Sequence, residues 1–145
     1  MAEILSGPLE MAASGFAYAE DPRWRNGRLY FSDMYGGKMH SVDRSGAVET
    51  VLELGEGTPS GLGFMPNGDL LAVLMFERTL LRLNKSGIAE HADLTSPASH
   101  SINDMVADRA ARAASALEAD RALAPKIRSS RILRFSVDFE GTGLP

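Results

Sequence analysis

The chain has 145 residues, of which 44% are hydrophobic, and a net charge of −4 with no long run of either sign. A chain of this length can bury a sizeable core in one domain, and the charge balance argues against nucleic acid or an anionic membrane as a partner. The absence of cysteine excludes disulfides, thiolate chemistry and cysteine-based zinc sites, which leaves oxygen and imidazole as metal ligands.

The N-terminal stretch MAEILSGPLEMAASGF has no basic segment followed by a long apolar core. Nowhere does an uninterrupted apolar run reach the roughly 18 residues of a membrane-spanning helix. We therefore expect a cytoplasmic protein with no membrane partner.

An internal repeat dominates the first two thirds of the chain. Residues Asn26 to Gly46 overlay residues Asn67 to Gly87 without a gap, at an offset of 41 residues. Both blocks contain a turn, a strand-like run, a break, a second strand and another turn, and a period near 40 is typical of β-propeller blades. An ordinary β meander with similarly spaced turns is the alternative. The repeat predicts four strands, namely Leu29–Asp33, Lys38–Asp43, Leu70–Leu74 and Thr79–Asn84.

The third repeat departs from this pattern near Asp108 and Arg109. The alanine-rich segment from Arg109 to Ala124 predicts a helix, and a strand-like segment, SSRILRFSVDFEGTG, follows only later. A helical insertion interrupts the third repeat, or other structure replaces part of it. We expect an all-β fold of about two to three propeller blades in residues 1–108, followed by a divergent segment in residues 109–145 with a helix and a strand-like tail.

The repeat also identifies equivalent positions at the start of each innermost strand. Shifting Ser101, Ile102 and Asn103 back by two periods places them on Ala19, Glu20 and Asp21. In a propeller this edge faces the central channel, where ligands usually bind. The pattern therefore predicts that Glu20 presents a carboxylate to a channel that Asn103 and Asp104 also approach.

The sequence resembles the SMP-30/gluconolactonase/LRE family. AEDPRW is similar to the family's AEGPRW signature, GRLYFSDMYGGKMHSVD resembles its first blade, and PSGLGFMPNGDLLAV with the later NDMVAD resembles its second blade and the opening of its third. The resemblance runs from about Gly15 to Asp108. It implies a six-bladed propeller that holds one divalent cation, calcium or alternatively zinc, and hydrolyses lactones.

The resemblance implies roles for three residues of this chain. Glu20 corresponds to a metal ligand and Asn103 to a substrate-contacting asparagine, while Asp104 follows in the same substrate-binding motif. No catalytic residue is identified, because the remaining ligands and the base belong to later blades that nothing after Asp108 matches. Two positions depart from the family: Asp21 stands where glycine is common, and Ser101 where some members have arginine.

The chain's three histidines have no metal-ligand spacing and are predicted to be surface or strand residues: His40, His91 and His100. The resemblance implies a metal-dependent hydrolase of a lactone or similar ester, impaired in this short chain. The alternatives are a non-catalytic propeller fragment or interaction module, and a strictosidine-synthase-like propeller. Because an open run of blades exposes strand edges, we also expect self-association and weak metal affinity.

Overall fold

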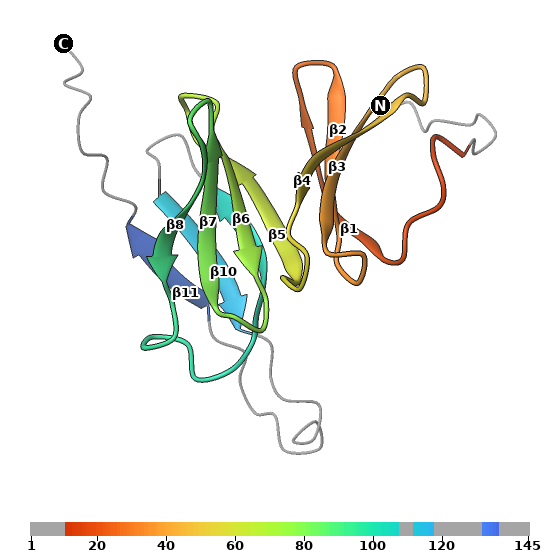
Figure 1. Cartoon of the computed structure of the whole chain (residues 1–145). Helices are drawn as coiled ribbons and strands as arrows, with labels where there is room; N and C mark the ends of the chain where they lie inside the picture. The colour runs from red at the N-terminus through yellow and green to blue at the C-terminus, as the bar shows by residue number, and fades with distance from the viewer. Residues whose placement is uncertain (1–10, 108–111, 118–131, 137–145) are drawn as a thin grey trace, which may run out of the picture.

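The computed structural model describes residues 11–107, 112–117 and 132–136 of the chain. The strands in these residues form three antiparallel sheets that follow one another along the chain (Figure 1). The described residues contain no helix, and so no helix that could cross a membrane. This part of the structure confirms the all-β fold class.

The first two sheets have the same four-stranded, up-and-down topology. Their strands pair strictly in chain order, β1-β2-β3-β4 and β5-β6-β7-β8. All four predicted strands are confirmed, three with the predicted bounds. The first sheet contains β1 (Ala19–Arg25), β2 (Arg28–Asp33), β3 (Lys38–Asp43) and β4 (Val48–Glu53), and the second contains β5 (Pro59–Phe64), β6 (Leu70–Leu74), β7 (Thr79–Asn84) and β8 (Gly87–Asp93).

The hairpin between β1 and β2 shows how local sequence sets the register. Asn26 and Gly27 form its two-residue loop and both have positive φ, 50° and 79°. A two-residue hairpin of type I′ requires this conformation at both positions, and Asn-Gly is the dipeptide that adopts it most readily. Arg25 and Arg28 are consequently paired on the two sides of the turn.

The third sheet has the order β11-β10-β9, with β9 at Ile102–Ala107, β10 at Arg112–Leu117 and β11 at Ile132–Ser136. The prediction of a helix from Arg109 to Ala124 is therefore wrong where the segment is described, since residues 112–117 are a strand. The remainder of that predicted helix lies outside the described residues. Alanine favours a helix by less than about 1 kcal/mol per residue over most other residues. Here β10 is instead hydrogen-bonded on both sides, to β9 and β11, and this tertiary pairing overrides the local preference.

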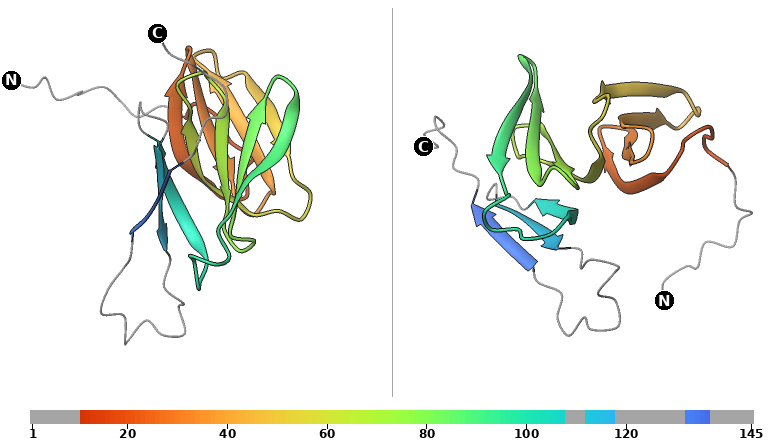
Figure 2. Two further views of the ribbon diagram at one scale, coloured as in Figure 1. Left: turned by 90° about the vertical axis from the view of Figure 1, so that its left-hand side faces the viewer. Right: turned by 60° about the horizontal axis from the view of Figure 1, so that its bottom comes forward.

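The three sheets lie side by side in an arc, with β1, β5 and β9 next to one another (Figure 2). One buried cluster joins the first and second sheets and includes Met39, Leu62 and Leu70. A second cluster joins the second and third sheets and includes Leu71, Val73 and Met105. Neighbouring sheets along the arc thus pack against each other through their faces, as propeller blades do. We call the three sheets blades 1, 2 and 3, in chain order.

Candidate functional site

The inner strands of blades 2 and 3 approach each other so closely that only glycine fits between them. A Cβ atom on Gly61 of β5 would lie 2.5 Å from the backbone nitrogen of Met105 on β9. No side chain can occupy that space without moving the backbone. The small residues of the SGLG stretch therefore position β9, and with it Asn103 and Asp104, against the centre of the molecule.

Asp21 connects blade 1 to blade 2 at the same level. It has a positive φ of 48°, within a bulge that shifts the β1–β2 register between Glu20 and Arg23. Glycine adopts this left-handed backbone conformation without strain, and aspartate tolerates it better than most other residues do. The carboxylate accepts a hydrogen bond from the backbone N–H of Leu62 and forms an ion pair with Arg23, whose Nη2 lies 2.6 Å from Oδ1.

Arg23 extends this link to blade 3. Its Nη2 donates a hydrogen bond of 2.7 Å to the carbonyl oxygen of Met105. The Leu62 N–H, the Asp21 carboxylate, the Arg23 guanidinium and the Met105 carbonyl therefore form one polar chain across three blades. We call this chain the Asp21–Arg23 clasp.

The charge of Asp21 is costly in this position. Burial raises the pKa of the Asp21 carboxyl, and the nearby negative charge of Asp104 raises it further. The Leu62 N–H and the Arg23 guanidinium oppose these effects but do not cancel them.

The predicted metal and substrate residues lie on either side of β5. Glu20 is on β1, opposite Ser32 of β2, and one of its carboxylate oxygens is buried. Asn103 is on β9, directly after the fully buried Ile102, and its side-chain oxygen is buried too. Asp104, the third predicted residue, is exposed. The inner strands thus present two shielded oxygen donors and one solvent-facing carboxylate around β5.

Glu20 also borders a hollow on the side of blade 1 that faces away from blade 2. This hollow has a volume of about 370 Å³, and most of its walls are apolar. Asn103 and Asp104 do not line it. Among the residues that the structure describes, no group of three or more histidine, aspartate or glutamate side chains could hold a metal ion.

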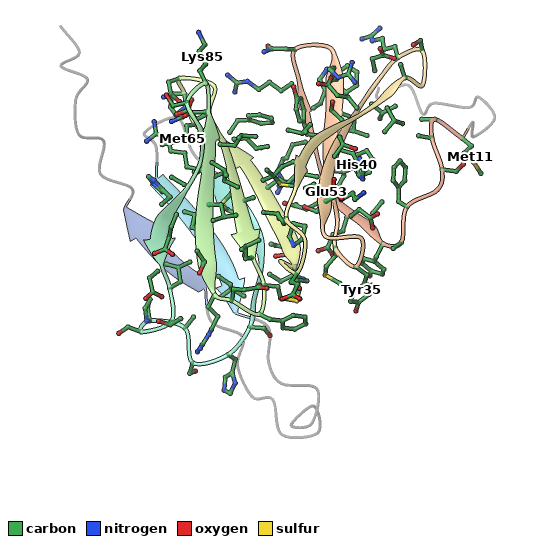
Figure 3. All side chains as sticks on the ribbon, in the orientation of Figure 1. Met11, Tyr35, His40, Glu53, Met65 and Lys85 are labelled. Carbon is green, nitrogen blue, oxygen red and sulfur yellow. The ribbon has the colours of Figure 1, made fainter. Side chains whose placement is uncertain are left out.

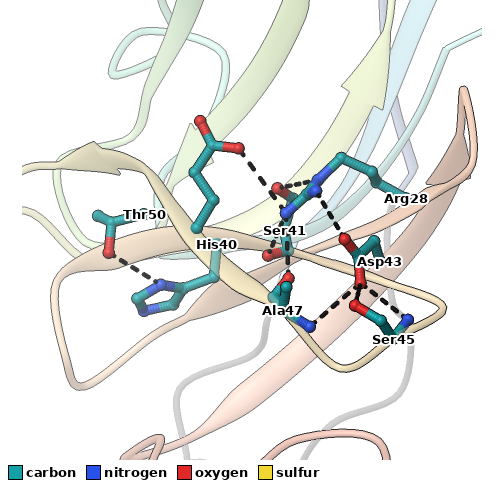
Figure 4. Close-up of polar contacts among 8 residues, drawn as sticks. Arg28, His40, Ser41, Asp43, Ser45, Ala47 and Thr50 are labelled. Atoms are coloured by element: carbon teal, nitrogen blue, oxygen red, sulfur yellow. Dashed lines mark hydrogen bonds and ion pairs between the residues drawn. The ribbon is translucent and has the colours of Figure 1, made fainter.

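The histidine in blade 1, His40, is packed inside the blade's own strands. His40 lies on β3, is buried, and has its Nδ1 atom 3.3 Å from the hydroxyl of Thr50 on β4 (Figure 4). Burial lowers the pKa of His40, although the charge of Asp33 acts in the opposite direction. The prediction of a strand histidine is confirmed for His40.

The remaining polar groups in that view hold the blade's own strands and turns. Arg28 donates a 2.8 Å hydrogen bond to the hydroxyl of Ser41, and Asp43 accepts the N–H groups of Ser45 and Ala47 at 2.8 and 3.1 Å (Figure 4). The Asp43 contacts stabilise the β3–β4 turn, and the Arg28 hydrogen bond joins β2 to β3. Among the residues drawn in Figure 4, these polar groups serve the packing of blade 1 and do not form a catalytic arrangement.

The clasp was not among the predicted features. Asp21 was expected only as a departure from a family motif, and no role was predicted for Arg23. A signal was nevertheless available, because Asp21 and Leu62 occupy equivalent positions one repeat apart and Asn103 is the next equivalent. Equivalent positions on neighbouring inner strands lie at the same depth in a propeller, so the repeat indicated that Asp21 and Leu62 lie at one level, but it did not indicate that they are in contact.

Comparison with known proteins places these features in context. The family model described as the SMP-30/Gluconolactonase/LRE-like region matches residues 18–140. This match extends beyond the motifs that end near Asp108 and includes the third sheet. No curated protein matches the sequence closely enough to count as a relative.

Solved structures share the fold at low sequence identity. A gluconolactonase from Xanthomonas campestris superposes with a TM-score of 0.64 at 18% identity, over 84% of this chain and 45% of its own. Regucalcin, a calcium-binding protein from Agrobacterium tumefaciens, superposes with a TM-score of 0.55 at 16% identity, over 86% of this chain and 49% of its own. Virginiamycin B lyase from Staphylococcus aureus superposes with a TM-score of 0.57 at 15% identity, over 81% of this chain and 41% of its own. The chain spans less than half the length of each of these structures, and proteins of different activity share its fold.

Proposed function

Because this chain belongs to the SMP-30/gluconolactonase/LRE-like family, we propose that it is a metal-dependent hydrolase acting on a lactone or a similar ester. The observation that supports this most directly is the pair of shielded oxygens on Glu20 and Asn103, on the inner strands of blades 1 and 3. The gluconolactonase and the calcium-binding regucalcin among the structural neighbours agree with such a role.

The donor chemistry fits a hard cation. Carboxylate and amide oxygens are ligands that calcium accepts, whereas a site for zinc more often includes imidazole. The described residues supply only part of a calcium shell, since calcium takes about six to eight oxygens. When bound, such a cation would polarise the carbonyl of the ester as a Lewis acid.

Each inner-strand residue has a distinct part in this proposal. Glu20 supplies the negative charge that attracts the cation, and Asn103 orients the substrate. Asp104, which is exposed, contacts the polar groups of the substrate at the solvent side. The Asp21–Arg23 clasp sets the spacing of β1, β5 and β9 and so the separation of these side chains.

Calcium-dependent thermal stabilisation tests the role of Glu20. We expect calcium to raise the melting temperature of the chain slightly, because the partial ligand set binds it weakly, and we expect Glu20→Gln to lose that rise. Glu49→Gln, on β4, is the matched control because its carboxylate is exposed and lies outside the inner strands. If calcium raised the melting temperature of Glu20→Gln as much as that of the wild type, Glu20 would not be a calcium ligand.

Hydrolysis of sugar lactones and aryl esters, with and without EDTA, tests the reaction. Turnover that EDTA abolishes and calcium restores supports the hydrolase. A second candidate is a non-catalytic interaction module, which is favoured by the lack of a cluster of three acidic or histidine side chains in the described residues. Calcium-induced stabilisation without any EDTA-sensitive turnover would favour that candidate.

A further inference from the structure

A pocket lies where blades 1 and 2 meet, and we call it the junction pocket. It has a volume of about 430 Å³. This is within the range of about 300–1,000 Å³ that small-molecule sites occupy. Tyr30 and Val51 line it from blade 1, and Phe64, Leu70 and Leu83 line it from blade 2. All of these except Leu70 are only partly buried, so part of their apolar surface faces solvent.

The junction pocket lies at the end of the blades opposite to the proposed hydrolase site. Its rim includes Gly68 of the β5–β6 turn and Lys85 of the β7–β8 turn. Figure 3 shows Lys85 at one end of the blades and Tyr35, in the β2–β3 turn, at the other. Glu20 lies near the start of β1, which pairs with the end of β2 just before that turn. The junction pocket is therefore separate from the proposed metal site.

Two aromatic rings and a guanidinium group lie together at this junction. Tyr30 and Phe64 are in contact across it, with their ring centroids 5.0 Å apart and their planes at 80°. The guanidinium carbon of Arg25 lies 4.8 Å from the centre of the Phe64 ring, which is a cation–π contact. A Cβ atom on Gly68 would lie 3.4 Å from the Nη2 atom of Arg25. Arg25 thus reaches from the β1–β2 hairpin to the rim of the pocket on blade 2.

The ionic contacts leave positive charge at the junction pocket. Its carboxylate, Asp69, accepts a 2.7 Å hydrogen bond from the Nε of Arg82, and this ion pair neutralises it. Among the described residues, neither Arg25 nor Lys85 has a carboxylate partner. The chain as a whole is acidic, with a net charge of −4. Two cations beside one apolar pocket therefore favour an anionic ligand.

We propose that the junction pocket binds a small aromatic anion, such as an aryl carboxylate. The ring of the ligand packs on Tyr30, Phe64 and Leu83, because a flat ring gains most by contact with aromatic and apolar side chains. The carboxylate lies at the rim, toward Arg25 and Lys85, where it accepts charge-assisted hydrogen bonds. This site does not depend on the proposed hydrolase activity.

Titration of the isotope-labelled 145-residue chain with cinnamate, followed through its amide chemical shifts, tests the proposal. We expect saturable shifts at Gly68, Leu83 and Lys85, and none at Glu20 or Asn103. The dissociation constant should be about 1 mM or tighter, as for other ligands of this size. Cinnamamide, which keeps the ring without the charge, and acetate, which keeps the charge without the ring, should each bind at least about fivefold more weakly.

Substitution of the two cations tests the charged end of the pocket. Lys85→Ser should weaken cinnamate binding about two- to fivefold, because it removes one exposed cation, and Arg25→Gln should have an effect of similar size. Arg44→Ser is the matched control and should leave the affinity unchanged. Arg44 occupies the equivalent turn one repeat before Lys85, and its guanidinium carbon lies 5.6 Å from the centre of the Trp24 ring.

The amide spectrum of each variant also reports whether it is folded. The absence of saturable shifts at the two turns of blade 2 would overturn the proposal. Equal affinity for cinnamamide, shifts centred on the inner strands, or the same loss of affinity in Arg44→Ser as in Lys85→Ser would overturn it as well.

Discussion

Gly61→Ala is the substitution that most directly tests how blade 3 is held against blade 2. The added Cβ would lie 2.5 Å from the nitrogen of Met105 and 2.8 Å from the carbonyl carbon of Asp104. Carbon and nitrogen atoms in ordinary contact are about 3.5 Å apart, so β5 and β9 must separate by about 1 Å. Both opposing atoms belong to the backbone and cannot rotate away.

We expect a loss of about 2–3 kcal/mol in the free energy of unfolding, the upper part of the range for overpacked cores. For a domain of this size that corresponds to a fall of roughly 5–12 °C in melting temperature. Urea unfolding and calorimetry measure both quantities. Gly61 has no positive φ, so relief of backbone strain does not contribute to the result.

Gly63→Ala, two residues along the same strand, is the matched control. Its closest obstacle is the terminal methyl of Met105 at 2.8 Å, and a flexible methionine side chain can move aside. We expect a cost of no more than about 1 kcal/mol. A Gly61→Ala protein as stable as the wild type, or a larger loss for Gly63→Ala, would refute the close approach of β5 and β9.

Three further changes probe the blades. Leu62→Ala, at a fully buried side chain between blades 1 and 2, should cost about 2–5 kcal/mol, whereas Ile88→Ala on the exposed side of β8 should cost about 0.5 kcal/mol or less in the same urea titration. Burial raises the pKa of Asp33, but the N–H groups of Tyr18, Ala17 and Gly36 outweigh it and lower that pKa overall. The ionised carboxylate therefore stabilises the fold above about pH 4, and Asp33→Asn should cost about 1–3 kcal/mol at pH 7 and less at pH 3; an equal cost at both pH values would contradict this. Burial lowers the pKa of His40 below its ordinary value of 6.5, so stability should decline as the pH falls below about 6.5, and His40→Gln should flatten that decline in melts between pH 5 and 8.

Local sequence patterns determined most of the strand framework. The turn dipeptides Asn26-Gly27 and Asn67-Gly68, each followed by strand-like apolar runs, predicted β2, β3, β6 and β7. These elements form because their residues are short-range neighbours whose conformations and hydrophobic spacing agree. The same repeat put Glu20 and Asn103 on inner strands of the arc.

Tertiary structure alone decided two other features. β10 is an alanine-rich segment with a helical local preference, and it is a strand because β9 and β11 satisfy its backbone hydrogen bonds from both sides. The clasp joins Asp21 and Arg23 to backbone groups of Leu62 and Met105, which lie one and two repeats further along the chain. Neither feature follows from propensity or spacing within one segment, because the partners that stabilise each are brought close only when the blades stack.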